Sequence, residues 1–293
     1  MPASASSSVQ QARQLIADRL RELREQAGLT GLAHARACGW HGSKTSRIEN
    51  NKTAPSTEDI RTWCRACGAE NQAADLVESL RAVEGMFVEW RRMERNGLRH
   101  AQGAIRPLYE RTHRFRAYSS WLIPGMIQTA EYTESVLRTI QQQRGLIDDV
   151  DHALALRVER QSLLHGGSRV FAFLVEESLL TTGVGSCEIM ASQLRHLTEV
   201  ARLPNVSFGI VPTRPGRNVW PVEDFWIYDD TQVNVELVSG YLTITQPGEV
   251  AMYARAFSSL ASAAVYGHEA RKLIVTAIDA LDTKAACNDV QRR

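Results

Sequence analysis

The sequence has no long hydrophobic run and few cysteines, and both absences narrow the possible classes of protein. A membrane-spanning helix needs about 18 consecutive apolar residues, whereas the longest apolar runs here, such as Val170–Val175, suit a buried strand. The opening residues M-P-A-S-A-S-S-S contain neither a basic nor an apolar segment, so we expect no secretory signal peptide. The five cysteines are odd in number and scattered, which argues against a disulfide framework. We therefore expect a cytoplasmic protein without a membrane partner.

Catalytic motifs are missing as well. The sequence contains no G-x-S-x-G, no H-E-x-x-H and no P-loop. Glu176 and Glu177 follow the apolar strand, where catalytic carboxylates are often found, but we interpret them as capping charges at a helix start. No combination of nucleophile, base and orienting group can be assembled. We expect that the protein is not an enzyme and uses no cofactor.

Charge is distributed unevenly although the net charge is only +1. Residues 1–117 contain 19 Lys and Arg against 13 Asp and Glu, a balance of +6, whereas residues 118–293 contain 15 and 20, a balance of −5. Such an asymmetry indicates different partners for the two halves. The near-zero total therefore does not argue against a nucleic-acid partner, because association depends on the local field at the binding surface.

The periodicity of apolar residues predicts two domains joined by a connector. Residues 1–8 are rich in Ser and Ala and are predicted to be disordered. Residues 9–80 show the spacing of short helices, the first of which should end at Gly28. Residues 81–117 contain nine arginines, no lysine and four glutamates, and are predicted to form a helical connector. Residues 118–285 mix strand and helix patterns, which predicts an α+β domain whose mixed or antiparallel sheet is flanked by helices.

The segment Leu20–Ala69 contains the most informative motif. Two short helices joined at Gly39, the second opening at Gly42-Ser43, describe a helix-turn-helix. The segment resembles the Cro and phage-repressor (XRE) family of DNA-binding domains through G-L-T at 28–30, C-G-W at 38–40, S-R-I-E-N at 46–50 and P-S at 55–56. The resemblance implies an all-α, lambda-repressor-like domain over residues 9–80 and double-stranded operator DNA as its partner.

Helical spacing places Gly42, Ser43, Ser46 and Arg47 on one face of the second helix, with Thr45 on the opposite, inward face. The resemblance implies that Ser43, Ser46 and Arg47 contact base edges, and Arg47 is the best candidate because a guanidinium can bond guanine O6 and N7 together. Phosphate contacts are expected from the following residues: Thr30 and Gly31 at a helix N-terminus, Lys44, and Asn51 and Lys52 in the next loop.

The same resemblance implies a structural ion pair between Arg24, near the end of the first helix, and Glu49, at the end of the recognition helix. Three positions depart from the family pattern. Gly31 stands at a position where the family often has glutamine, and His34 stands where the family usually has a buried leucine. Gly42 occupies the first base-reading position, and glycine offers no side chain there.

Two cysteine-containing pairs have the spacing of metal ligands. Cys64-x-x-Cys67 could be half a zinc site or a redox pair, and His34 and Cys38 lie one helical turn apart. No second C-x-x-C accompanies them, so a packed helical core is the better interpretation of both, and we expect no metal.

The second half resembles the C-terminal domain of WhiJ-type regulators of actinomycetes. The resemblance is carried by five segments: F-V-E-W-R-R at 87–92, L-I-P-G-M-I-Q-T-A-E-Y at 122–132, R-V-E-R-Q at 157–161, L-P-N-V at 203–206 and P-G-E-V-A-M-Y at 247–253. The segment at 122–132 either lines a pocket or interface, or forms a turn packed in the core.

The resemblance to WhiJ-type regulators implies a domain that senses a ligand or binds a small partner protein. We therefore expect a transcriptional regulator whose affinity for DNA is modulated by a small protein or small-molecule effector. A homodimer is expected because one recognition helix reads too few base pairs to find a site. The alternative is an antitoxin-like interaction protein that sequesters a small partner protein and regulates its own gene.

Overall fold

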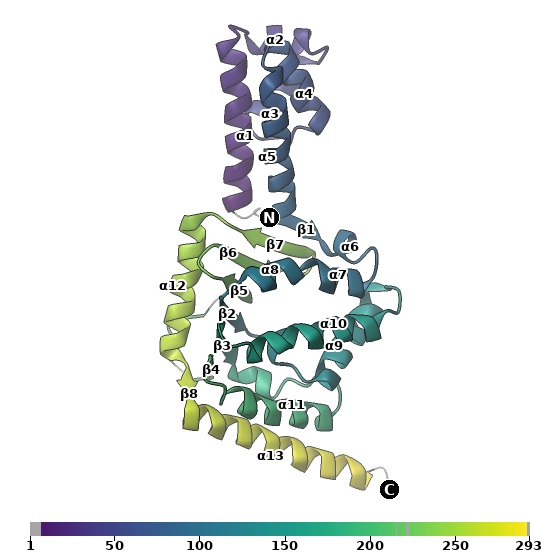
Figure 1. The fold of residues 1–293 in the computed structure, drawn as a ribbon, viewed down its shortest axis with the longest axis vertical. Coiled ribbons are helices and arrows are strands. Elements are labelled where there is room, and N and C mark those ends of the chain that lie inside the picture. Colours follow the sequence, from purple (N-terminus) through teal and green to yellow (C-terminus); the bar gives the residue numbers. More distant parts are fainter. Residues whose placement is uncertain (1–6, 215, 221–222, 292–293) are drawn as a thin grey trace. The chain divides into compact units, whose positions relative to one another are not determined.

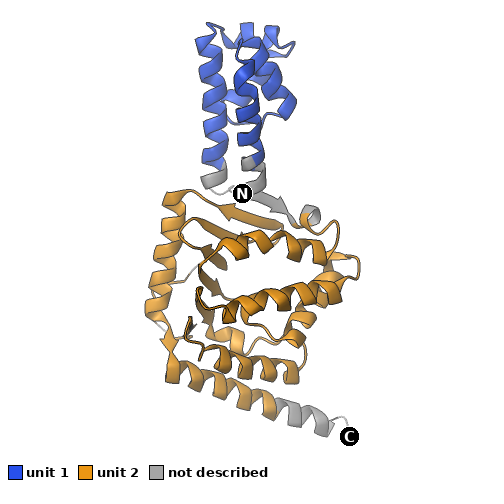
Figure 2. Ribbon diagram, viewed as in Figure 1, with its two compact units in different colours: residues 1–88 blue, residues 89–293 orange. Residues whose placement is uncertain are grey.

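The structure is a computed structural model that describes residues 7–214, 216–220 and 223–291 and divides the chain into two compact units. Unit 1 comprises residues 1–88 and unit 2 residues 89–293 (Figure 2). Most of the tail predicted to be disordered lies outside the described residues, and Ser7 and Ser8 begin the first helix. None of the described helices combines the length and the apolar character needed to cross a bilayer.

Unit 1 is a bundle of short helices, as the sequence predicted (Figure 1). Helix α1 ends just before Gly28, whose φ of +67° is a left-handed conformation that favours glycine. Ile16, Leu20 and Leu23 of the periodic residues of α1 are buried, and the Trp63 indole donates a hydrogen bond to the Leu20 carbonyl oxygen at 2.9 Å. The helices are α1 (Ser7–Gln26), α2 (Gly31–Ala37), α3 (Gly42–Glu49), α4 (Thr57–Ala66), the 3-10 turn η1 (Glu70–Gln72) and α5 (Ala73–Met86).

The Arg-rich stretch 81–117 is not the single helical connector that the sequence suggested. After α5 it contains β1 (Phe87–Glu89), α6 (Trp90–Met93), α7 (Leu98–Ala104) and α8 (Arg106–Arg111), and it runs into the first strand of the main sheet. Gly97 has φ +91° and Pro107 lies in the first turn of α8, so the backbone cannot continue as one helix. A Cβ atom at Gly97 would also collide with the Asp149 carboxylate. Unit 2 therefore begins at residue 89 rather than at residue 118.

A mixed sheet forms the centre of unit 2 and confirms the predicted α+β arrangement. Strands β2 (Arg114–Ser119), β3 (Val170–Glu176) and β4 (Val206–Val211) are parallel to one another. Strands β5 (Phe225–Tyr228), β6 (Gln232–Glu236) and β7 (Gly240–Ile244) continue the sheet in antiparallel fashion, and β8 (Val265–Tyr266) pairs antiparallel with β4. From β7 onward the order is β7-β6-β5-β2-β3-β4-β8.

Helices cover both faces of this sheet (Figure 1). Helix α12 (Pro247–Ala263) packs on β4, β5 and β6 from one side. The other side is covered by α8, α9 (Ala130–Arg144), α10 (Val150–Gln161) and α11 (Cys187–Val200), with the 3-10 turns η2 (Gly125–Ile127), η3 (Ser162–His165) and η4 (Glu177–Leu180) between them. Helix α13 (Gly267–Gln291) packs against α11.

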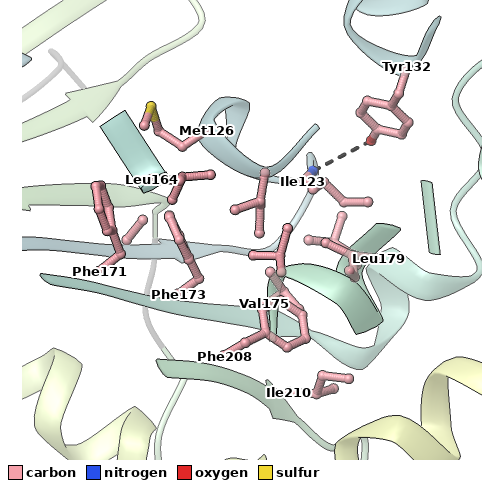
Figure 3. Packing of buried hydrophobic residues seen from close by; sticks show 14 of the residues in the cluster. Ile123, Met126, Tyr132, Leu164, Phe171, Phe173, Val175, Leu179, Phe208 and Ile210 are labelled. Atoms are coloured by element: carbon pink, nitrogen blue, oxygen red, sulfur yellow. Dashed lines mark hydrogen bonds between the residues drawn. The ribbon is translucent and has the colours of Figure 1, made fainter. Parts of the chain in front are cut away.

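The core of unit 2 is filled by large apolar side chains that alternate along the strands (Figure 3). Phe171, Phe173 and Val175 lie on one face of β3 and are each at most 2 % exposed, because that face packs into the core. Ile123 and Met126 join them from the segment 122–132. Of the two interpretations of that segment, the structure favours the turn packed in the core.

Candidate nucleic-acid interface

The turn between α2 and α3 comprises residues 38–41. Gly39 has φ +69°, a conformation in which a side chain would be strained, and its N–H donates to the Arg36 carbonyl oxygen at 3.1 Å. Each helix begins with a side-chain cap: Thr30 Oγ1 accepts from Ala33 N–H at 3.2 Å, and His41 Nδ1 accepts from Ser43 N–H at 3.3 Å. Glycine at the turn and these two caps set the starting points of the two helices.

Helix α3 presents an exposed polar row on one face. Ser43, Ser46 and Arg47 are all exposed, whereas Thr45 and Ile48 on the opposite face are buried. The exposed face continues to Asn50, whose Nδ2 donates to the Ser46 carbonyl oxygen at 2.7 Å. Sequence reasoning missed Asn50, although its spacing of four residues from Ser46 would have revealed it.

The residues expected to contact phosphate occupy different environments. Thr30 and Lys52 are exposed and Gly31 is half-buried at the start of α2. Asn51 has φ +51°, which asparagine tolerates in a turn, and its Nδ2 donates to the Gln10 carbonyl oxygen at 3.4 Å.

Lys44 is engaged within unit 1. Its Nζ lies 2.5 Å from Asp59 Oδ1 of α4 and 4.3 Å from the centroid of the Trp40 ring. A phosphate contact would have to draw the ammonium group away from this ion pair, so Lys44 is the weakest of the expected phosphate ligands.

The recognition helix is held at its C-terminal end by two arginines of α1. Arg24 Nε lies 2.5 Å from Glu49 Oε1, and Arg24 Nη1 donates to the Leu29 carbonyl oxygen at 2.7 Å. The Arg24 and Glu49 side chains are only 12 % and 11 % exposed, so the ion pair implied by the resemblance is largely withdrawn from water. Glu49 raises the pKa of Arg24 through this contact. Arg21, which sequence reasoning missed, donates to the Glu49 carbonyl oxygen at 2.7 Å.

The polar residue that replaces the usual buried leucine, His34, sits inside the unit 1 core. It is 0 % exposed, its ring centroid lies 4.0 Å from that of Trp63, and its Nδ1 is 3.4 Å from Thr45 Oγ1. Burial lowers the pKa of His34, and Arg24 adds to this effect while Glu49 opposes it. The neutral imidazole is therefore the form that fits between α2 and α3.

The cysteines of unit 1 are free thiols within the helical bundle. Cys64 is buried in the core, and burial raises the pKa of both Cys38 and Cys67 to about 11. Thiols with such pKa values are neutral at physiological pH, and the neutral thiol is a weaker nucleophile than the thiolate. In the described part of the chain, no three His, Cys, Asp or Glu side chains gather as a metal site would require.

His34 makes the stability of unit 1 depend on pH. Its pKa is lowered in the folded state and returns to about 6.5 on unfolding, so the unfolded chain binds the extra proton. The contribution to stability is fully present above pH ~6.5 and is lost as the pH falls toward the folded-state pKa. Hydrogen exchange of unit 1 amides at pH 7.5 and 5.5 measures this loss, which we expect the variant His34→Leu to reduce. An equal loss in wild type and His34→Leu contradicts the assignment. The variant His41→Asn, which keeps a capping side chain, should behave as wild type.

Comparison with known protein families adds to this geometry. Residues 106–276, more than half of the chain, match the family described as a domain of unknown function (DUF5753). The chain belongs to this family. Ahead of its DUF5753 region, residues 15–77 match a helix-turn-helix domain, which spans α2, the turn and α3. Helix-turn-helix domains bind DNA by placing their second helix in the major groove.

Other comparisons with this DUF5753 protein are less informative. A search of curated proteins gives no significant match. The solved structure of TrmBL2, an archaeal chromatin protein described as having a novel mode of DNA binding, aligns with 85 % of this chain and 99 % of its own. The alignment has 12 % sequence identity and a TM-score of 0.31, which is too low to support an argument.

In the DUF5753 region the paired glutamates differ from their expected role. Glu176 ends β3, but its carboxylate caps no helix: Tyr118 Oη donates to it at 2.5 Å, and Arg217 donates from Nη1 at 2.6 Å and from Nη2 at 2.5 Å. Glu177 accepts a hydrogen bond from Thr213 N–H at 2.7 Å. Both carboxylates therefore form hydrogen bonds with residues that follow β4, namely Thr213 and Arg217. The interpretation of Glu176 as a capping charge is wrong.

Proposed function

We propose that this chain is a sequence-specific transcriptional regulator that binds operator DNA through α3. The observation that carries the proposal is the exposed row formed by Ser43, Ser46 and Arg47 on the second helix of a helix-turn-helix. Arg47 is exposed and forms none of the ion pairs found among the described residues, so its guanidinium is available to bond guanine O6 and N7. The serine hydroxyls can donate to or accept from neighbouring base edges.

Contacts to the DNA backbone would fix the position of α3 in the groove. The start of α2 offers the N–H groups of a helix N-terminus near Thr30 and Gly31, which favour an anionic phosphate. Lys52 in the loop after α3 is exposed and adds a positive charge. Such contacts position a protein on the duplex without specifying sequence.

The proposed active form on DNA is a homodimer. One recognition helix reads too few base pairs to single out a site, whereas two bind half-sites centred one helical turn, about 34 Å, apart. Unit 2 would respond to a small molecule or a small partner protein and change the affinity for DNA. We also propose that unit 2 binds its ligand without chemistry, a view supported by the engagement of Glu176 with Arg217 and Tyr118, which leaves this carboxylate unavailable as a base.

Selection of bound sequences from a random DNA library, using the full chain, tests this proposal. We expect enrichment of a palindromic site whose half-sites are centred about 10 base pairs apart. Sedimentation of the complex with the selected DNA should give two chains per site. Equal affinity for the selected site and for scrambled DNA would overturn the sequence-specific function, and one chain per site would overturn the dimer.

A further inference from the structure

Two arginines of α10, Arg157 and Arg160, lie in unit 2 without a carboxylate in direct contact, although the carboxylate of Glu236 on β6 interacts with Arg157 from a greater distance. Arg157 Nε donates to Gln102 Oε1 at 3.2 Å, and Arg157 Nη1 donates to Gln128 Oε1 at 3.3 Å. Arg160 Nη2 donates to the same Gln102 Oε1 at 3.0 Å, and Arg160 Nη1 to the Gln102 carbonyl oxygen at 3.3 Å. Two guanidinium groups therefore share one neutral amide. We call Arg157, Arg160 and Gln102 the arginine pair site.

The arginine pair site differs from the other arginines around it. Arg144 lies 2.5 Å from the buried carboxylate of Glu94, and Arg138 and Arg106 each contact a carboxylate four residues away along their own helices. Among the described residues, no carboxylate lies within ion-pair distance of Arg157 or Arg160. Arg160 Nε is in addition buried without any hydrogen-bond acceptor in the described structure.

This arrangement is electrostatically unfavourable for the protein alone. Both side chains are only partly exposed, and they lie three residues apart on one helix. Burial, with a further contribution from Arg160, lowers the pKa of Arg157 to about 10, while the carboxylate of Glu236 opposes this shift. Partly buried like charges need an anion or a strong acceptor to compensate the loss of hydration. Their hydrogen bonds go only to neutral oxygens, and Glu236 offsets the charge of Arg157 without forming an ion pair with it. A bound anion would therefore supply the direct charged partner that both guanidinium groups lack.

Aromatic rings flank the arginine pair site on the side of the sheet. The Arg160 guanidinium carbon lies 4.8 Å from the centroid of the Tyr109 ring of α8. The Tyr109 ring centroid lies 6.2 Å from that of Trp226 on β5, which is half-buried. A ligand bound by the guanidinium groups can therefore place a flat apolar body beside these rings.

We propose that Arg157 and Arg160 form the anion-binding part of a ligand site in unit 2, which takes a small aromatic carboxylate. The carboxylate would accept hydrogen bonds from both guanidinium groups, including the unpaired Arg160 Nε, and the aromatic ring would pack near Tyr109 and Trp226. Charge-assisted hydrogen bonds from two arginines give such a head group its strength and orientation. The role of this ligand as the effector of DNA binding rests on the proposed function, whereas its binding does not.

Binding is tested on the full chain without DNA, by thermal denaturation and calorimetry with benzoate as the probe. We expect benzoate to raise the melting temperature of unit 2, and the neutral isostere benzamide to leave it unchanged. Arg157→Gln and Arg160→Gln should each weaken benzoate binding about tenfold or more. Arg138→Gln, which removes an arginine of α9 with its own carboxylate partners, should bind benzoate as wild type does.

Three outcomes would overturn the proposal. Equal shifts with benzoate and benzamide exclude the anion-binding role, and equal shifts with benzoate and inorganic phosphate at matched ionic strength exclude the aromatic carboxylate. If Arg138→Gln loses as much benzoate binding as Arg157→Gln and Arg160→Gln do, benzoate does not bind at the arginine pair site. Because these measurements contain no DNA, their failure is separate from failure of the proposed function.

The stability of the variants without ligand gives a second readout. A purely structural role for Arg157 predicts that Arg157→Gln melts at a lower temperature than wild type. The proposed role predicts an unchanged melting temperature or a rise of about 2–4 °C, because one of two neighbouring like charges without a direct ion pair is removed. A marked fall in the melting temperature of Arg157→Gln together with unaltered benzoate binding would contradict the proposal.

Discussion

Replacing Arg47 with alanine should weaken binding to the selected operator by about 5- to 150-fold, the range expected for losing one bidentate contact to guanine. The Arg47 side chain is exposed on α3, so the fold of unit 1 should be unaffected. Because the contact is to a base, affinity for scrambled DNA should fall much less than affinity for the operator. Electrophoretic mobility shifts at one fixed salt concentration measure both affinities.

Arg81→Ala serves as the matched control. Arg81 is also an exposed arginine of unit 1, but it lies on α5, where it pairs with Glu78 at 2.5 Å. The two variants lose the same charge, so a difference between them reports position rather than net charge. Undiminished discrimination in Arg47→Ala would show that α3 does not read the operator with this residue.

Breaking the ion pair between Arg24 and Glu49 should destabilise unit 1 by about 3 kcal/mol, the lower end of the range for removing one partner of a buried pair. Glu49→Gln leaves the Arg24 guanidinium, at 12 % exposure, without a carboxylate partner. Arg24→Gln likewise leaves the Glu49 carboxylate, at 11 % exposure, without its positive partner. For a domain of this size the melting temperature should fall by about 10 °C or more. Hydrogen exchange of the α1 and α3 amides in the full chain locates the loss.

The double variant distinguishes the pair from its separate residues. If the pair acts as a unit, Arg24→Gln combined with Glu49→Gln should cost less than the sum of the two single changes. Glu22→Gln provides the control, because it breaks the surface pair of Arg19 and Glu22, at 42 % and 55 % exposure, and leaves the hydrogen bond from Arg19 to Gln72 in place. Such surface pairs contribute at most ~1 kcal/mol. Additive single changes at Arg24 and Glu49 would contradict a coupled pair.

Local patterns in the sequence predicted the elements with well-defined starts and stops. Gly39 marked the turn because a left-handed conformation favours glycine, and the apolar run at 170–175 marked β3 because most of this central strand is buried, although Val170 at its start is 50 % exposed. The turn between β5 and β6 contains Asp229-Asp230, with Asp229 at φ +51°, and two such residues between two strand patterns are a local hairpin signal. These signals lie within a few residues of one another, so periodicity and turn chemistry are sufficient to predict them.

Contacts between distant residues could not be predicted in this way. Glu176 meets Arg217 across 41 residues and Tyr118 across 58, and nothing near Glu176 in the sequence indicates either partner. Lys44 was expected to contact phosphate, yet its nearest anion is Asp59 in the following helix. The polar composition of the Arg-rich stretch 81–117 predicted one helix. Some of its arginines instead pair with residues far along the chain, as Arg114 and Arg116 do with Asp230, and the local sequence does not indicate such partners.

The attachment of α3 at its C-terminal end has a geometric consequence for DNA recognition. Arg21 and Arg24 both hold Glu49, whereas the side chain expected to make the first base contact, Ser43, lies near the opposite end of the helix. An eight-residue helix is about 12 Å long, so a tilt about the Glu49 anchor reaches Ser43 over nearly the full length of the helix, against the hold of the Lys44–Asp59 ion pair near its start. A rotation of about 10° at the anchor moves the far end by about 2 Å, which exceeds the tolerance of a hydrogen bond. Small changes in the orientation of α1 would therefore be amplified at the base edges, and the precision of sequence reading depends on the stiffness of a helix that need not touch DNA.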